Sequence, residues 1–256
     1  MSTLREGVLI STLWTKEREL DMASDYFKSF QRSYWNYYLE LEERMEATKK
    51  YVEFDLDNKN VYSSTYLMLM QAVCSEIDVV AKEIASHFSM DFQNDKGNKS
   101  INRWWYVIQD NLPEAVRTIT FADSIERNPW DKFRVVKVTT KRTNNQGQQI
   151  DVTNYNLQQK GQGITYATPK WWNAYNKVKH KRVDSDSDGM NYKKANLDNL
   201  TYAFAALYLL EFEYMNKIGT IEERVGCGRS ILFGMGDLEK NYISNLFITT
   251  HESGEK

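Results

Sequence analysis

Residues 200–210 (LTYAFAALYLL) constrain the fold more than any other part of this 256-residue chain, because they are apolar on nearly every side of a helix. Such a helix must be buried on most sides, as the central rod of a bundle or at a subunit interface. The stretch is shorter than the roughly 18 residues that a bilayer span needs, so we expect no membrane segment. We expect the complete helix to run from Tyr192 to Ile218 and to end at Gly219.

Two earlier segments have the spacing of amphipathic helices. The first runs from about Lys16 to Val52, and the second begins at Ser63 or Ser64, either of which can cap it. The short, turn-rich segment 55–60 joins them, which predicts an antiparallel helical hairpin. Ser100 can cap a short further helix that carries Trp104 and Trp105. The apolar positions that define the first two helices are Tyr26, Phe30, Tyr34, Leu41, Met45, Tyr66, Met70, Val73, Ile77, Ile84 and Phe88.

Helical spacing disappears between about residues 115 and 165. Residues 133–140 (FRVVKVTT) are rich in β-branched side chains, and 143–149 (TNNQGQQ) resemble a turn before a second strand at 150–155. We expect a small β hairpin or three-strand patch that ends at Gly161 and Gly163. The hydrophobic tail segment 230–236 (SILFGMG), which ends among the glycines Gly234 and Gly236, is interpreted as a strand packing on this insertion.

Together these patterns predict a mainly α protein, one helical-bundle domain over residues 1–256 with a β-rich insertion at about 115–165. The charges nearly balance, with 33 Lys and Arg against 35 Asp and Glu, which argues against non-specific coating of nucleic acid. The two cysteines, Cys74 and Cys227, are too few to stabilise a chain of this length by disulfides, and such a composition is typical of a reducing compartment. We therefore expect a cytoplasmic protein without a bound cofactor.

The strongest candidate for chemistry is the predicted helix 170–183, which Thr168 is expected to cap and Pro169 to begin. The segment has no acid, and Asn176 and His180 lie one turn apart on one face. An imidazole can move a proton near neutral pH, and nearby cations can stabilise the charge that develops on a phosphodiester. The cations of the segment are Lys170, Lys177, Lys179, Lys181 and Arg182.

We assign provisional roles to these residues. His180 is the expected general base or acid, Asn176 orients the phosphate or the imidazole, and Lys179 and Arg182 stabilise charge. Glu76, on the second helix, is a candidate to orient His180, with surface pairing to Lys82 or Lys179 as the alternative. The expected substrate contacts are Lys177, Lys181, Tyr175 and Trp172. The alternative for the whole segment is a solvated basic face beside a structural histidine.

The spacing of Asn176 and His180 on a late helix of an all-helical bundle resembles that of HEPN proteins. Their signature is an arginine, a polar residue, three further residues and a histidine. Tyr175 stands where the arginine is expected, so Lys179 or Arg182 would replace it, or the chain is an inactive relative. The resemblance covers about half of the chain and leaves the β insertion outside.

The resemblance implies a metal-independent endoribonuclease that acts as a homodimer. It also implies a role in a prokaryotic toxin–antitoxin or anti-phage system, together with a partner protein from the same operon. The apolar helix 197–212 has more hydrophobic surface than one bundle easily hides, which also favours a homodimer. The rival hypothesis is a non-catalytic helical interaction or regulatory module of a defence system, which the tyrosine at position 175 favours.

An acidic turn provides a further candidate. Asp184, Asp186 and Asp188 alternate before Gly189, as in the first half of a calcium loop. The bidentate glutamate that completes such a loop is replaced by Ala195. The alternative is a hydrated connection between two helices.

Overall fold

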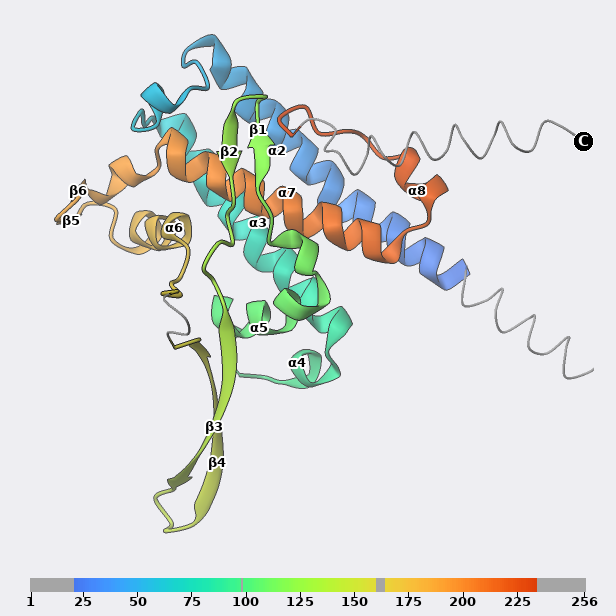
Figure 1. The fold of residues 1–256 in the computed structure, drawn as a ribbon, viewed down its shortest axis with the longest axis vertical. Coiled ribbons are helices and arrows are strands. Elements are labelled where there is room, and N and C mark those ends of the chain that lie inside the picture. Colours follow the sequence, from blue (N-terminus) through green and yellow to red (C-terminus); the bar gives the residue numbers. More distant parts are fainter. Residues whose placement is uncertain (1–20, 98, 160–163, 234–256) are drawn as a thin grey trace, which may run out of the picture.

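The computed structural model describes residues 21–97, 99–159 and 164–233. Within these ranges the chain is mainly helical, with three small two-stranded antiparallel sheets (Figure 1). This confirms the predicted mainly α class with a small amount of β structure inserted between helices. None of the helices described is both long enough and apolar enough to cross a membrane.

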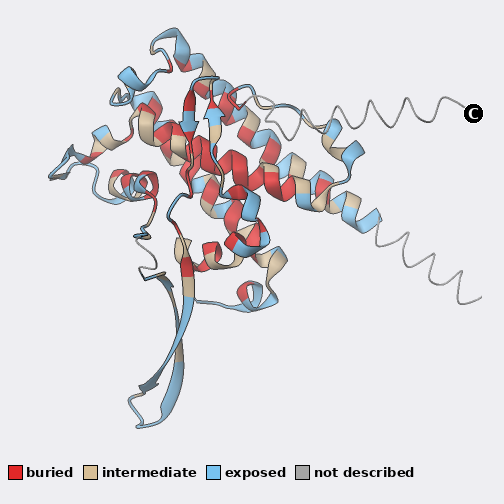
Figure 2. Ribbon diagram, in the orientation of Figure 1, coloured by how far each residue is buried: buried red, intermediate tan, exposed pale blue. Residues whose placement is uncertain are grey.

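The apolar segment lies in α7 (Leu197–Ile218), which is the central rod of the bundle (Figure 2). Residues 203–211 are all buried within the single chain, against α3, α6 and the first helix. The hydrophobicity of α7 therefore gives no reason of its own to expect a dimer. The helix ends before Gly219 as predicted, but it begins at Leu197 instead of Tyr192, because the side chain of Asn196 caps it by accepting from Asn199 N–H at 3.0 Å.

Residues 21–50 are helical throughout and pack against α3 (Ser64–Phe88) as an antiparallel pair. The first helix comprises residues 21–30, a π-helical turn (Gln31–Trp35), α2 (Asn36–Glu46) and a 3-10 turn (Ala47–Lys50). Its expected start at Lys16 lies outside the described residues. The Ser63 hydroxyl accepts from Tyr66 N–H at 3.0 Å, which confirms the predicted cap of α3. A 3-10 turn (Leu56–Asn58) lies in the connection.

A cluster of tryptophans joins α5 to the insertion and to α6. α4 (Met90–Asn94) and α5 (Ile101–Asn111) follow α3, and a 3-10 turn (Pro113–Ala115) leads into the insertion. Trp105 stacks on Trp130 with ring centroids 4.4 Å apart, and its Nε1 donates to Phe133 O at 2.8 Å. Trp171 Nε1 donates to Pro129 O at 2.9 Å. These contacts fix the insertion and α6 to one core.

The insertion forms two hairpins. β1 (Ile119–Phe121) pairs with β2 (Ile125–Arg127) beside α7, and β3 (Val135–Thr143) pairs with β4 (Gln149–Leu157) in a long ribbon that leaves the body (Figure 1). Both predicted strands and the turn between them are confirmed. Gly161 and Gly163 lie outside the described residues.

The predicted tail strand is wrong where it is described, because residue 230 has no regular structure and residues 231–233 make bends. These residues do pack on the insertion, where Ala122 N–H donates to Leu232 O at 2.7 Å. They depart from strand geometry because their polar groups bind a buried carboxylate, Glu42, instead of a neighbouring strand. Residues 234–236 of the same prediction lie outside the described ranges. Between α7 and this tail lies α8 (Ile221–Val225).

Candidate nucleic-acid interface

The helix that carries the predicted site is α6 (Lys170–His180). Pro169, and not Thr168, occupies its N-cap position: the Pro169 carbonyl accepts from the backbone N–H groups of Trp172 and Asn173, both at 3.1 Å. The predicted cap was therefore wrong by one residue, because an extended proline can supply the first carbonyl of the helix without a side-chain cap. The helix ends at His180, three residues earlier than expected.

One face of α6 is sealed against the core. Trp171, Trp172, Ala174, Tyr175 and Val178 are buried, and the ring centroids of Trp172 and Tyr175 lie 5.3 Å apart. Tyr175 is 5% exposed and Trp172 is 7% exposed. Neither ring has a free face on which a base can stack, so the structure offers no support for their predicted substrate contacts. Burial, with some help from the neighbouring Asp78, raises the pKa of Tyr175, while Lys179 opposes that shift.

Lys177 is bound to an acid and is not available as a free cation. Its Nζ lies 2.5 Å from Asp186 Oδ2, and Lys194 Nζ lies 2.9 Å from Asp186 Oδ1. Lys177 first, and then Lys194, hold the pKa of the Asp186 carboxyl well below its usual range. This pairing ties α6 to the loop before α7.

The acidic turn itself folds as a tight hairpin of β5 (Ser185–Asp186) and β6 (Gly189–Met190), followed by a 3-10 turn (Asn191–Lys194). Gly189 has φ +97°, which a glycine adopts without strain. Because two lysines occupy the Asp186 oxygens, that carboxylate is not free for a calcium ion. In the described ranges no group of three or more His, Cys, Asp or Glu side chains is arranged to hold a metal.

The last turn of α6 and the two residues after it form an exposed cationic surface, which we call the basic end of α6 (residues 179–182). Lys179, His180, Lys181 and Arg182 are all exposed, and none makes an ion pair with a described residue. Lys179 Nζ lies 5.4 Å from the centroid of the Tyr175 ring. The carbonyl end of a helix favours cations, which helps to explain their position. An imidazole open to solvent among three cations can meet a phosphodiester.

Asn176 lies one turn before His180 and is half-buried, beside the exposed surface. Lys170, at the other end of the helix, is exposed. The structure therefore brings together Asn176, Lys179, His180, Lys181 and Arg182 at the end of α6, whereas Lys177 of the same helix is paired with Asp186.

Glu76 is not placed to orient His180. It lies on α3 and faces Glu211 of α7, and burial raises the pKa of its carboxyl. The acid of α3 that lies near α6 is Asp78, whose charge acts on the Tyr175 phenol. Asp78 also accepts from Trp104 Nε1 of α5 at 3.3 Å and pairs with Lys82. Residues two positions apart on a helix point in nearly opposite directions, so only one of these two acids can face α6.

Sequence reasoning also missed two fully buried carboxylates. Glu42 of α2 accepts from the backbone N–H groups of Ile231 and Leu232, at 2.8 and 3.1 Å, and from the hydroxyls of Tyr38 and Ser230. Glu211 is buried with no hydrogen bond to either carboxylate oxygen. The only signal in the sequence is an acid within an apolar helical stretch, which does not reveal a distant partner.

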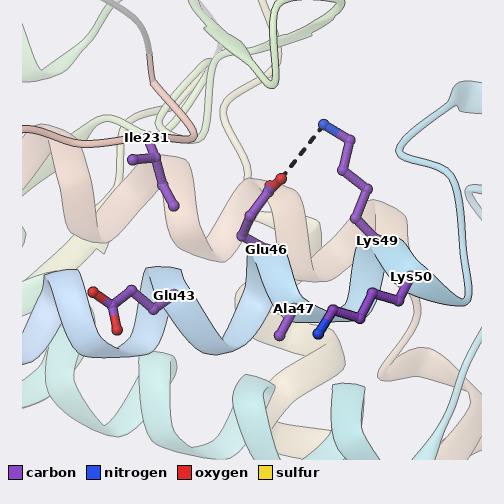
Figure 3. A pocket seen from close by; sticks show the side chains of 6 residues that line it. All are labelled: Glu43, Glu46, Ala47, Lys49, Lys50 and Ile231. Carbon is purple, nitrogen blue, oxygen red and sulfur yellow. Dashed lines mark ion pairs between the residues drawn. The ribbon is translucent and has the colours of Figure 1, made fainter.

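A surface depression beside α2 involves none of these residues. It is lined by Glu43, Glu46, Ala47, Lys49, Lys50 and Ile231 (Figure 3). Lys49 Nζ and Glu46 Oε1 lie 3.5 Å apart across its edge. Because its lining carries charges of both signs and includes no residue of α6, we do not assign it to the candidate interface.

The structure defines a class of protein only by architecture, a mainly helical bundle with antiparallel hairpins. No protein-family model matches the chain, and no significant similarity was found to a curated protein or to a solved structure.

Proposed function

We propose that the chain binds RNA at the basic end of α6 and cleaves it without a metal ion, as a HEPN-type endoribonuclease of a prokaryotic toxin–antitoxin or anti-phage system. The observation that carries the proposal is the exposure of His180 among Lys179, Lys181 and Arg182, none of which is neutralised by a described acid. Non-specific attraction between such cations and phosphates supplies much of the affinity for nucleic acid.

The cleavage step needs a proton acceptor and a proton donor. In our proposal the ribose 2′-oxygen attacks the adjacent phosphorus as its proton leaves, and the bond from phosphorus to the 5′-oxygen breaks as that oxygen gains a proton. His180 serves as the base or the acid, and a homodimer supplies a second copy of the same imidazole. The signature arginine is replaced by Tyr175, which is buried. We therefore assign stabilisation of the charge on the phosphate to the guanidinium of Arg182, two residues after His180.

The test is incubation of the pure protein with a mixed RNA pool in the presence of EDTA. His180→Ala should reduce cleavage at least about 100-fold, the lower range for loss of a general acid or base. Its unfolding temperature should stay the same, because the side chain is exposed. The matched control is His87→Ala, which removes another exposed imidazole, on α3, and should cleave like wild type. Equal cleavage by wild type and His180→Ala would eliminate the catalytic role.

The second candidate is a non-catalytic interaction or regulatory module of a defence system. The burial of Tyr175 at the position of the signature arginine favours it, because a phosphate at the basic end of α6 cannot reach that position. RNA binding without cleavage by the wild-type protein, under every metal-free condition, is the outcome that this candidate predicts.

A further inference from the structure

The ribbon of β3 and β4, which we call the arm (residues 135–157), is rigidly anchored at its base. The Gln109 side chain donates to Val135 O at 2.7 Å and accepts from Val135 N–H at 3.0 Å. Asn102 Nδ2 donates to Tyr155 O at 3.1 Å, and the Tyr155 ring lies 5.2 Å from that of Tyr106. The direction of the arm is therefore set by α5.

Beyond this base the arm stands away from the body, with both strand edges open (Figures 1 and 2). Every residue of β3 from Lys137 to Thr143 is exposed. The turn at the tip is well formed, because Asn144 Oδ1 accepts from the N–H groups of Gln146 and Gln148, both at 2.9 Å. Strands of this length extend about 30 Å. An isolated two-stranded ribbon is at best marginally stable in water, so a bound partner is expected.

The chemistry of the exposed part fits a nucleic-acid backbone. The exposed part carries three cations, Lys137, Lys141 and Arg142, and one acid, Asp151, which is the cross-strand partner of Lys141. None of the four makes an ion pair with a described residue. Hydroxyl and amide side chains, which commonly contact phosphate and sugar, supply most of the rest. They are Thr139, Thr140, Thr143, Thr153, Asn154, Gln148 and Gln149.

The kind of nucleic acid follows from what the arm lacks. Between Val138 and Asn154 there is no aromatic residue. Proteins hold single strands largely by stacking bases on aromatic rings. Double-stranded RNA is instead recognised by its shape, through phosphates and 2′-hydroxyls. The exposed arm suits the second mode.

The base of the arm lies beside the segment that leads into α6. Gln158 N–H donates to Arg134 O at 2.9 Å, and Ala167 N–H donates to Lys132 O at 2.8 Å, so the strands and the segment before α6 meet at one place. The basic end lies at the other end of α6, about 16 Å further along this 11-residue helix, so a ligand that contacts both surfaces must span the helix as well as the arm. The arm also adds cations on the far side of that meeting point.

We propose that the arm binds the backbone of a double-stranded segment in the same RNA whose single-stranded segment is held at the basic end of α6. The proposal rests on the proposed function of α6, and it defines the substrate class as an RNA with a stem next to a single strand. The arm contributes affinity for the stem and takes no part in the cleavage step.

The test measures the affinity for a stem-and-tail RNA and for the tail alone by fluorescence anisotropy, at several salt concentrations and with EDTA. All proteins carry His180→Ala so that the RNA stays intact. Lys137→Gln/Lys141→Gln removes two exposed cations from one face of the ribbon, because side chains alternate along a strand. The double change should lower the steepness of the salt dependence for the stem-and-tail RNA by about 1.5, because each phosphate contact contributes about 0.7–0.9. Its affinity for the tail alone should be unchanged. In a second variant, Asn-Gly replaces residues 138–154 and closes a two-residue hairpin. This variant should lose more affinity for the stem-and-tail RNA and keep its affinity for the tail alone.

Two controls distinguish RNA binding by the arm from binding by other basic surfaces. Lys49→Gln/Lys50→Gln removes two exposed cations from the far end of the first helix and should bind both RNAs like the parent protein. Lys179→Gln/Lys181→Gln should weaken binding of both RNAs. The unfolding temperature of Lys137→Gln/Lys141→Gln is expected to match the parent, because both side chains are exposed.

Each outcome has a distinct meaning. If both arm variants bind the stem-and-tail RNA like the parent while the α6 variant is weakened, the arm proposal is overturned and the proposed function survives. If the parent binds neither RNA, both fail. If shortening the arm dissociates a dimer without changing affinity for the stem, the arm pairs with a second copy and the proposal is again overturned.

Discussion

Glu211 is expected to make the stability of this protein depend on pH, and Glu211→Gln should remove that dependence. The carboxyl group is completely buried in α7, and neither oxygen has a hydrogen-bond partner. Burial, reinforced by the nearby Glu76, raises the pKa of Glu211 well above its usual range. A carboxylate in such a place must be protonated or must pay the desolvation cost of its charge.

The direction of the effect follows from proton binding. In the unfolded chain a glutamate loses its proton near pH 4.3, whereas folded Glu211 keeps it to much higher pH. The folded state then binds one proton more than the unfolded state, so stability falls as the pH rises above the unfolded pKa. The slope is about 1.4 kcal/mol per pH unit until the folded pKa is reached.

The measurement is thermal unfolding of wild type and Glu211→Gln from pH 5.5 to 7.5. Relative to wild type, the variant should gain stability as the pH rises through this range, by up to about 1.4 kcal/mol per pH unit, because glutamine does not titrate. For a domain of this size, each kcal/mol of that gain should widen the gap in unfolding temperature by roughly 2–4 °C. The control Glu43→Gln, on the exposed face of α2, should follow wild type at each pH. Parallel curves for wild type and Glu211→Gln would refute the reasoning.

Two further substitutions test the packing. Glu42→Ala leaves the N–H groups of Ile231 and Leu232 without their acceptor, so urea unfolding should show a loss of at least about 3 kcal/mol. Limited proteolysis should also cut more readily near residues 228–233. Unchanged resistance to the protease would contradict the conclusion that Glu42 holds this segment in place. Gly219→Ala places a Cβ 2.3 Å from Phe27 Cε2 and should cost about 1–3 kcal/mol by the same assay. Adding Phe27→Leu to Gly219→Ala should cost less than the sum of the single changes, whereas strict additivity would show that this contact is not the cause.

The main elements of the fold were predictable from local patterns. An apolar stretch at 200–210 is compatible only with a buried helix, and the β-branched run at 133–140 with its polar turn is typical of a hairpin. The cap at Ser63 follows from the same local chemistry, because the hydroxyl and the N–H that it binds are three residues apart.

The interactions between distant segments were not predictable. Lys177 looked like a free cation until Asp186 and Lys194 were placed beside it, and Tyr175 looked available until Trp172 and α3 covered it. Periodicity shows which face of a helix is apolar, but not which polar groups another segment brings to it. The same limit explains why Glu76 was expected to orient His180, although Asp78 is the acid of α3 that lies near α6.

Ultraviolet crosslinking of the protein to a 4-thiouridine-labelled stem-and-tail RNA, with the crosslinked peptides identified by mass spectrometry, tests the central claim most directly. We predict crosslinks within residues 179–182, and their loss in Lys179→Gln/Lys181→Gln. Crosslinks confined to other surfaces, such as the depression beside α2, with none at residues 179–182, would contradict the assignment of RNA binding to the end of α6.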